Sequence, residues 1–335
     1  MKAIGYNRIG EIEDPSSLVL LEVELPELDP YDLLVEVKAV SVNPVDVKVR
    51  RIFEPEGAGR VTGYDVSGVV CAVGSAVTKF QPGHEVYYAG DLQRAGANAE
   101  FHAVDEALVG HKPQSLSHAQ AASLPLTTLT AWELLFDSFG VRQEESRGES
   151  ILIVGAAGGV GSMLIQLVHQ LTYLNIVAGA SRRDSIQWVN ALGADCVINH
   201  HDSIPEQLAR IGVVPKYVAS LIGTERNFTE LVDSLPPFGH LGLIDDPEDI
   251  PINYIKHKAL SLHWEFMFAR SMHEAADMDK QGRILNRVAE LVDAGYIQPT
   301  VTLERGVLTP EGLHAAHLHQ SSGQMIGKQV FEVAF

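Results

Sequence analysis

The sequence has 335 residues, with 25 Lys and Arg against 43 Asp and Glu, so its formal charge is −18. This acidic balance argues against non-specific binding to nucleic acid or to an anionic membrane, because both need Lys and Arg to meet phosphate groups. Two cysteines exclude a disulfide framework and a four-cysteine zinc site. No apolar segment suits a signal peptide or a bilayer span, which predicts a soluble cytoplasmic protein.

The first 120 residues are predicted to form short strands separated by glycine and proline turns. Alternating apolar and polar residues indicate a strand over Leu33–Val42. Further strands are expected at Val66–Val73, Glu85–Tyr88 and Ala99–Ala103. Short strands clustered in this way, with such turns between them, are typical of a compact, barrel-like unit.

From about residue 124 the pattern changes, because a helix-like segment is followed by short apolar strands that alternate with helices. The expected strands are Ile151–Gly155, Asn175–Ala180, Asp195–Asn199, Tyr217–Leu221 and His240–Ile244. The expected helices are Val160–Leu171, Asp184–Leu192, Ser203–Ile211 and Arg226–Leu235. This alternation predicts βαβ units and a parallel sheet with helices on both faces.

After residue 255 the alternation weakens. Ser261–Phe268 resembles a strand, and amphipathic helices are expected at Ala275–Ala294 and Thr309–His319. Gln329–Val333 is expected to be the final strand. We infer that the chain returns here to the unit formed by its first 120 residues.

The most informative segment is a buried strand that runs directly into a glycine-rich turn and then a helix. Gly155, Gly158 and Gly161 are spaced G-x-x-G-x-x-G, with Gly159 in addition. Glycine permits the tight turn and the close approach of a pyrophosphate, and the helix start offers free N–H groups. The segment therefore predicts a dinucleotide site in which Gly159 and Val160 meet the pyrophosphate.

The next expected strand ends in Ser181, Arg182 and Arg183. A site for NAD usually carries Asp or Glu here, to bind the ribose 2′-hydroxyl. Arginine instead pairs well with a phosphate dianion. We therefore predict NADP(H) as the cofactor, with Ser181 and Arg182 at its 2′-phosphate. Arg183 is a further candidate, and a solvated position at the helix start is an open alternative for one or both arginines.

Several ordered motifs carry a resemblance that extends over essentially the whole chain. They are Ser41–Arg50, Gly63–Tyr87, Ala121–Glu133, Gly155–Ser162, Asn190–Asp195 and Gly327–Val333. On these motifs the chain resembles the medium-chain dehydrogenase/reductase superfamily, specifically its zinc-free quinone oxidoreductase branch. It is similar to a bacterial subgroup called zinc-type alcohol dehydrogenase-like.

The resemblance implies an α/β protein of two domains. A GroES-like, β-rich catalytic domain would be split between residues 1–123 and 260–335. A Rossmann domain, with a doubly wound parallel sheet that binds NADP, would occupy residues 124–259. Members of the superfamily act on small molecules and are usually dimers or tetramers, so a homodimer or homotetramer is expected, with no nucleic-acid or membrane partner.

The resemblance also shows where zinc-binding members carry their ligands. Asn43 stands at the position of a cysteine, and Tyr64 replaces the histidine of a GHE motif. The third position lies in Leu124–Thr128, which contains no cysteine, histidine or carboxylate. A catalytic zinc needs three nitrogen, sulfur or oxygen ligands. We therefore expect no metal site.

The remaining site residues are implied by the same resemblance. Asn43 should lie near the nicotinamide ribose or the substrate carbonyl, and Asp46 would orient it. Tyr64 is the candidate hydrogen-bond donor, with a buried core aromatic as its alternative. Further contacts to the cofactor are implied for Thr127, Thr130, Phe238, Leu243 and Lys328, although both threonines could instead bond to their own helix.

Without zinc, no Lewis acid would polarise an alcohol oxygen. Hydride transfer then needs an acceptor that is already electrophilic, such as a quinone or an α,β-unsaturated carbonyl. We predict an NADPH-dependent oxidoreductase that reduces such an acceptor without a metal. Two alternatives stay open, namely a zinc-dependent alcohol dehydrogenase with displaced ligands and a non-catalytic NADPH-binding protein.

Overall fold

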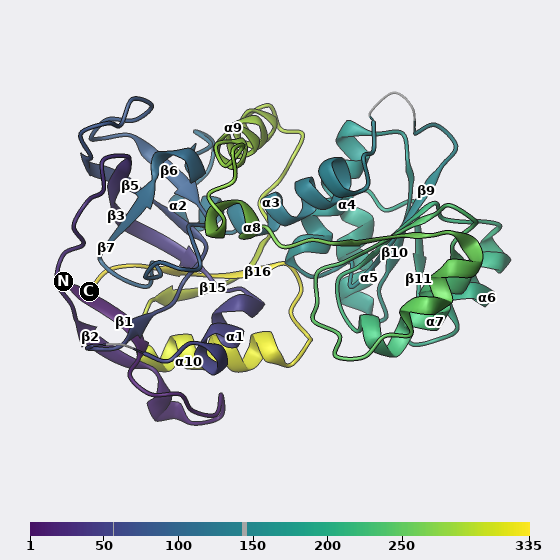
Figure 1. The fold of residues 1–335 in the computed structure, drawn as a ribbon, viewed down its shortest axis with the longest axis horizontal. Helices are drawn as coiled ribbons and strands as arrows, with labels where there is room; N and C mark the ends of the chain where they lie inside the picture. Colours follow the sequence, from purple (N-terminus) through teal and green to yellow (C-terminus); the bar gives the residue numbers. More distant parts are fainter. Residues whose placement is uncertain (56, 143–145) are drawn as a thin grey trace. The chain divides into compact units, whose positions relative to one another are not determined.

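The computed structural model describes residues 1–55, 57–142 and 146–335. The chain forms two compact units, which can be followed by colour in Figure 1. The first unit contains Met1–Leu129 and Phe268–Phe335, and the second contains Thr130–Met267. The chain thus leaves the first unit and returns to it, and the changes of unit fall a few residues after the domain boundaries expected at 123/124 and 259/260.

The first unit is built on a seven-stranded sheet with the order β15-β16-β3-β5-β6-β8, in which β7 also pairs with β3. Its strands are β3 (Asp32–Ser41), β5 (Val66–Val73), β6 (Glu85–Tyr88), β7 (Phe101–Asp105), β8 (Gly110–His111), β15 (Val301–Val307) and β16 (Lys328–Glu332). A smaller sheet contains β2 (Val19–Glu22), β1 (Lys2–Tyr6) and β4 (Arg60–Val61) in that order.

The C-terminal strand β16 is antiparallel to β3, with Phe331 opposite Val40. This pairing brings the start of β16 next to the end of β3. The side chains of Val35, Val37 and Val40 on β3 are buried in the core of the unit. The alternating pattern of this segment therefore marked a central strand, as expected.

Helices surround the sheets of the first unit. They are α1 (Pro44–Ile52), α2 (His118–Ala122), α8 (Ala269–Met272), α9 (Lys280–Asp293) and α10 (Pro310–Ser321), with short 3₁₀ turns at Pro15–Ser17 and Glu106–Leu108. α3 (Pro125–Trp132) begins in this unit and continues as a π-helical segment, Glu133–Ser138. None of the helices among the described residues has the length and apolar content needed to cross a membrane.

One helix was missed in the sequence, and another was predicted too long. No element was predicted over Pro44–Ile52, which forms α1, where proline occupies the first turn and has no N–H that needs a partner. The helix expected over Ala275–Ala294 is shorter in the structure, where α9 begins at Lys280 and ends at Asp293. A separate short helix, α8, precedes it.

The second unit contains a six-stranded sheet with the order β11-β10-β9-β12-β13-β14, and every neighbouring pair is parallel. Its strands are β9 (Ser150–Val154), β10 (Asn175–Gly179), β11 (Cys196–Ile198), β12 (Tyr217–Ser220), β13 (His240–Leu243) and β14 (Ser261–Trp264). Its helices are α4 (Gly159–Leu171), α5 (Arg183–Ala191), α6 (Ile204–Ile211) and α7 (Thr224–Ser234), and a 3₁₀ segment covers Ile252–Lys258.

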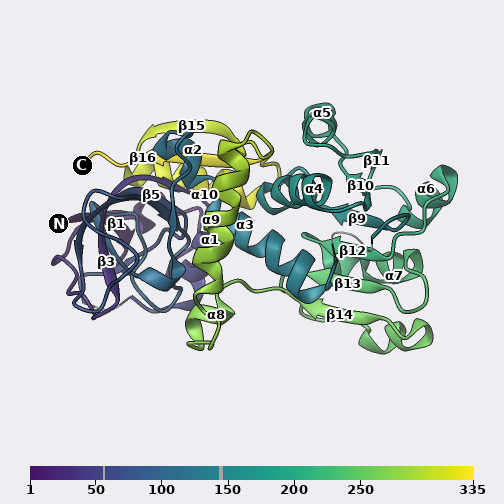
Figure 2. The same ribbon diagram turned by 90° about the horizontal axis from the view of Figure 1, so that it is seen from above.

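The strand order of the second unit is that of a doubly wound sheet, which confirms the predicted α/β class. Strands β9, β10 and β11 extend the sheet in one direction, and β12, β13 and β14 extend it in the other. Right-handed crossovers then place α4 and α5 on one face, and α6 packs against α7 on the other (Figure 2). All five residues of β9 are buried, as expected for a central strand covered on both faces.

Candidate functional site

The glycine-rich loop joins β9 to α4. Gly155 has a φ of +77°, a backbone conformation that residues other than glycine rarely adopt. A Cβ on Gly161 would lie 2.4 Å from the carbonyl oxygen of Ala156, so α4 passes too close to the loop for any side chain there. Gly158 is the N-cap of α4 and provides no capping side chain. The first N–H groups of α4 are thus available to an anion, as dinucleotide binding requires.

The serine and the two arginines lie between β10 and α5. Because β10 and β9 are parallel and Gly179 is level with Val154, both strands end at the same edge of the sheet. Arg182 is the N-cap of α5 and is exposed, as is Arg183, and the backbone N–H of Arg182 donates to the Ser185 hydroxyl (3.1 Å). The structure therefore brings these residues to the edge that carries the glycine loop.

Two further residues near this edge were not among the predicted site residues. His200 follows β11, and its Nδ1 is buried with no hydrogen-bond partner among the described residues. Burial is the main cause that lowers the pKa of His200, and the charges of His201, Arg226 and Arg182 lower it further. Arg226, on α7, therefore lies close to the same region. Its position in the helix that follows β12 was the signal that could have pointed to it.

A cluster of buried polar side chains lies in the first unit, at the end of β3. The members come from β3, from the N-cap and first turn of α1, from the turn before β5 and from the start of β16. They are Ser41, Asn43, Asp46, Asp65 and Lys328, and each is at most 3% exposed. Since buried polar groups are costly unless they are paired, the contacts among them decide what this buried cluster can do.

The carboxylate of Asp65 is the centre of the buried cluster. Its Oδ2 accepts hydrogen bonds from the Ser41 hydroxyl (2.9 Å), the Asn43 amide (2.8 Å) and the Lys328 ammonium (2.9 Å). Its Oδ1 accepts from the backbone N–H of Leu126 (2.9 Å). A buried charge with this many partners is well compensated. Removing a charged partner would leave the remaining charge buried and uncompensated, which is strongly destabilising.

The resemblance implied a coenzyme phosphate as the partner of Lys328, and the structure shows three protein acceptors around its ammonium group. Its ammonium group donates to the carbonyl oxygen of Val42 (2.8 Å), to Oδ1 of Asn43 (2.5 Å) and to Asp65. An ammonium group has three hydrogens, so these three acceptors use all of them. The side chain is 3% exposed.

Asp46 closes the first turn of α1. Its carboxylate accepts from the backbone N–H of Asn43 (2.7 Å) and of Gly63 (3.0 Å). Burial is the main cause that raises the pKa of Asp46 to about 7, and these two hydrogen bonds oppose the shift. Asp46 thus orients Asn43 through its backbone, and its proton is held more tightly in the folded protein than in the unfolded chain.

The raised pKa of Asp46 predicts a pH-dependent contribution to stability. The folded state binds the proton up to about pH 7 and the unfolded chain only up to about pH 4, so stability falls as pH rises through this window. We expect the unfolding free energy of the natural protein, relative to Asp46→Asn, to fall by up to about 1.4 kcal/mol per pH unit. Urea unfolding of both proteins between pH 4.5 and 8 measures this. A difference that stays constant with pH would contradict the expectation.

Tyr64 is 1% exposed and packs edge-on against Phe268, with ring centroids 5.6 Å apart. Its hydroxyl has no hydrogen-bond partner among the described residues. Burial raises the pKa of Tyr64 to about 12, so the hydroxyl keeps its proton. The Nε of Arg60 is likewise buried without a partner, and Arg60 is close enough for its charge to lower the pKa of Tyr64 against the effect of burial. Two groups therefore suit the hydroxyl, namely the Arg60 guanidinium and an oxygen atom of a bound ligand.

The other predicted contacts divide between two environments. Thr127 donates to the carbonyl oxygen of Leu124 in its own chain segment (3.1 Å), as its alternative supposed, while Thr130 is buried in the second unit. Leu243 ends β13 and therefore lies at the edge of the glycine loop. Phe238 precedes β13, at the opposite edge, and is 75% exposed. The structure thus brings Leu243 near the loop but not Phe238.

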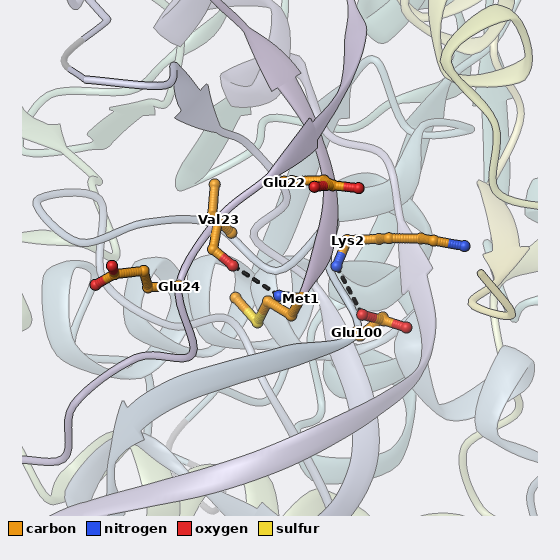
Figure 3. A pocket seen from close by; sticks show the side chains of 6 residues that line it. All are labelled: Met1, Lys2, Glu22, Val23, Glu24 and Glu100. Atoms are coloured by element: carbon orange, nitrogen blue, oxygen red, sulfur yellow. Dashed lines mark hydrogen bonds between the residues drawn. The ribbon is translucent and has the colours of Figure 1, made fainter.

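An open pocket of about 380 Å³ lies at the start of β1, away from these residues (Figure 3). Its lining is Met1, Lys2, Glu22, Val23, Glu24 and Glu100. The N-terminal ammonium donates to the carbonyl oxygen of Val23 (2.7 Å), and the backbone N–H of Lys2 donates to the Glu100 carboxylate (2.6 Å). Its acidic lining does not suit a dinucleotide, and it contains none of the predicted site residues.

The donor groups at the zinc-ligand positions do not fit zinc. The oxygen of Asn43 and the carboxylate of Asp65 already bind the ammonium of Lys328, and Tyr64 offers a phenol with a raised pKa. A zinc site is built from cysteine, histidine and carboxylate ligands. Across residues 1–55, 57–142 and 146–335, no three histidine, cysteine, aspartate or glutamate side chains gather in a way that could hold a metal ion.

Comparison with known proteins agrees with the fold. The family described as "Alcohol dehydrogenase GroES-like domain" matches residues 29–114. The zinc-type alcohol dehydrogenase-like protein of Staphylococcus aureus (strain COL) is 37% identical, over 99% of this chain and 100% of its own length. The solved structure of a candidate zinc-dependent alcohol dehydrogenase from Rhizobium etli CFN 42 is 46% identical, covers 100% of this chain and 98% of its own, and has a TM-score of 0.94.

The quinone oxidoreductase of Coxiella burnetii is 27% identical, over 100% of this chain and 99% of its own, with a TM-score of 0.81. The matches and the fold define an oxidoreductase with a GroES-like domain and a Rossmann-like domain. The chain belongs to the medium-chain dehydrogenase/reductase superfamily, which confirms the resemblance found in the sequence.

Proposed function

We propose that this protein uses NADPH to transfer a hydride to a quinone or an α,β-unsaturated carbonyl, without a metal. The observation that carries the proposal is the edge of the parallel sheet, where the glycine loop and Arg182 follow the neighbouring strands β9 and β10. The name of the Coxiella burnetii relative, a quinone oxidoreductase, supports the class of acceptor.

The second unit offers the groups that a nicotinamide dinucleotide needs. The close packing at Gly161 and the first N–H groups of α4 would hold the pyrophosphate. Ser181 and Arg182 would hold the 2′-phosphate, since a guanidinium group makes strong charged hydrogen bonds to phosphate. When bound, the nicotinamide supplies the hydride.

The first unit offers hydrogen-bond donors for the acceptor. Tyr64 has a protonated, buried hydroxyl without a partner, and Asn43 has an amide held in place by the buried cluster. Such donors stabilise an oxygen that gains negative charge as the hydride arrives, because they are already oriented in a medium of low polarity. Because the donors at the zinc-ligand positions do not fit zinc, the proposal includes no metal.

A turnover screen tests the proposal. The protein is purified without an affinity tag. It is incubated with NADPH and a quinone, an enone or an aldehyde, or with NADP⁺ and an alcohol. Its zinc content is measured separately. We expect oxidation of NADPH by a quinone or an enone and far less than one zinc per chain. One tightly bound zinc, lost together with activity, would favour an alcohol dehydrogenase. Tight binding of NADPH with no turnover would favour a non-catalytic protein.

We also propose that the protein is a cytoplasmic homodimer or homotetramer. Its charge of −18 supports a small-molecule substrate rather than nucleic acid or an anionic membrane. Light scattering coupled to gel filtration measures the oligomeric state, and a monomer at micromolar concentration would contradict this part of the proposal.

A further inference from the structure

The amide of Asn43 is held from both ends by buried charges. Its Oδ1 accepts from the Lys328 ammonium at 2.5 Å, and its Nδ2 donates to the Asp65 carboxylate at 2.8 Å. An ammonium group can only donate hydrogen bonds and an ionised carboxylate can only accept them. Turning the amide over would set like against like at both contacts. Lys328 and Asp65 therefore fix which way the amide points.

One hydrogen of this amide is left over. Nδ2 carries two hydrogens, and one of them goes to Asp65. No described residue accepts the other from Asn43. The ammonium of Lys328 on Oδ1 also draws electron density toward that oxygen, which makes the remaining N–H a stronger donor. The buried cluster thus prepares one oriented, polarised N–H group.

The pairing also limits what else Lys328 can do. Its three acceptors are Val42, Asn43 and Asp65, so no hydrogen remains for a phosphate. Lys328 lies at the start of β16, which pairs with β3 and thereby fixes the ammonium beside Asn43. The side chain is 3% exposed, and its ammonium lies 2.9 Å from the carboxylate of Asp65.

We infer that Lys328 is a positioning residue that acts through Asn43. Together with Asp65, it presents the second amide hydrogen of Asn43 to the carbonyl oxygen of the acceptor, which selects acceptors that carry such an oxygen. The inference rests on the proposed function, because it takes Asn43 to contact the acceptor.

The kinetic test compares Lys328→Met, Lys328→Arg, Asn43→Ala and the double variant Asn43→Ala/Lys328→Met. With the best acceptor from the screen, Lys328→Met is expected to lower kcat by about 10- to 100-fold. This is less than the about 100- to 1,000-fold that loss of an oriented donor costs, because the amide of Asn43 is still present but is no longer fixed by Lys328. The Kd for NADPH should stay within about twofold of the natural protein, because Lys328 has no hydrogen for a phosphate. Lys328→Arg should restore part of the lost kcat.

The double variant separates positioning from a structural role. If Lys328 acts through Asn43, adding Lys328→Met to Asn43→Ala should cause no further loss of kcat. Lys112 provides the control, because it is also a buried lysine of the first unit. It donates to the backbone oxygens of Pro113 and Leu116 and pairs with the exposed carboxylate of Glu85 (3.2 Å), rather than with the buried cluster. Lys112→Met should lower the melting temperature and leave kcat unchanged. Additive losses, or a Kd for NADPH raised tenfold or more by Lys328→Met, would overturn the inference.

A spectroscopic measurement keeps the inference testable if no acceptor is turned over. In protein with ¹⁵N-labelled asparagine, the side-chain amide signals of Asn43 are those that disappear in Asn43→Ala. They should shift in Lys328→Met and stay in place in Lys112→Met. Signals that do not move in Lys328→Met would refute the positioning role, whereas a failed screen with a clear shift would refute only the proposed function.

Discussion

Replacing Arg182 by alanine is expected to weaken the binding of NADPH by about 10- to 100-fold and that of NADH by less than about twofold. Hydrogen bonds to charged groups contribute about 1.5–3 kcal/mol, and 1.4 kcal/mol corresponds to a factor of ten. The two cofactors differ only in the 2′-phosphate, so the loss should fall on NADPH alone. Titration calorimetry with each cofactor measures both constants.

Arg210→Ala is the control for this experiment. Arg210 lies on α6 of the same unit, is exposed and forms an ion pair with Glu206 (3.4 Å). Its removal should change the affinity for neither cofactor, because exposed pairs contribute little. Equal weakening of NADPH and NADH by Arg182→Ala would remove the basis for predicting NADP(H).

Replacing Gly161 by alanine is expected to abolish measurable dinucleotide binding and to destabilise the second unit. The new Cβ would lie 2.4 Å from the carbonyl oxygen and 2.6 Å from the carbonyl carbon of Ala156, and backbone atoms cannot move aside without shifting the loop or α4. Overpacking of this kind costs about 1–3 kcal/mol. Thermal unfolding and titration with NADPH measure the two effects.

Gly158→Ala provides a comparison within the same loop. Gly158 has a φ of −71°, which any residue adopts, and its Cβ would lie 3.5 Å from the oxygen of Gly155, an ordinary contact. The melting temperature of Gly158→Ala should therefore stay close to that of the natural protein. A melting temperature of Gly161→Ala that also stays unchanged would show that α4 does not pack against the loop as described.

The second unit could be predicted from the sequence almost element by element. Its signals are local, because each strand is a short apolar run and each helix follows within a few residues. The glycine loop was predicted with its strand and helix, and α4 begins at Gly159, one residue before the expected start. The position of Phe238 could also have been predicted, because Phe238 precedes the expected strand His240–Ile244. In a parallel sheet the residues before a strand lie at the edge opposite the glycine loop, which follows its strand.

The buried cluster of the first unit was only partly predictable. Asn43, Asp46 and Tyr64 stand in short motifs near one another in the sequence, so they could be named as candidates. The partner of Asp65 could not, because Lys328 is 263 residues away and reaches it only through the pairing of β16 with β3. Asp65 itself has no apolar pattern to mark it as buried. Long-range pairing of strands decides such contacts, and no local pattern shows them.

The pairing of β16 with β3 has a consequence for the order of events during synthesis. The second unit is one continuous segment, Thr130–Met267, so it can fold while the rest of the chain is still being made. The first unit cannot complete its fold until the end of the chain has been made. Its strand β16, which pairs with β3, follows every other strand and helix of the structure. Until then the end of β3, residues 39–41, lacks its partner strand and presents an unpaired edge, which favours aggregation. A ribosome that stalls after Gly323 would therefore leave a protein with a complete glycine loop but with neither Lys328 nor an oriented Asn43.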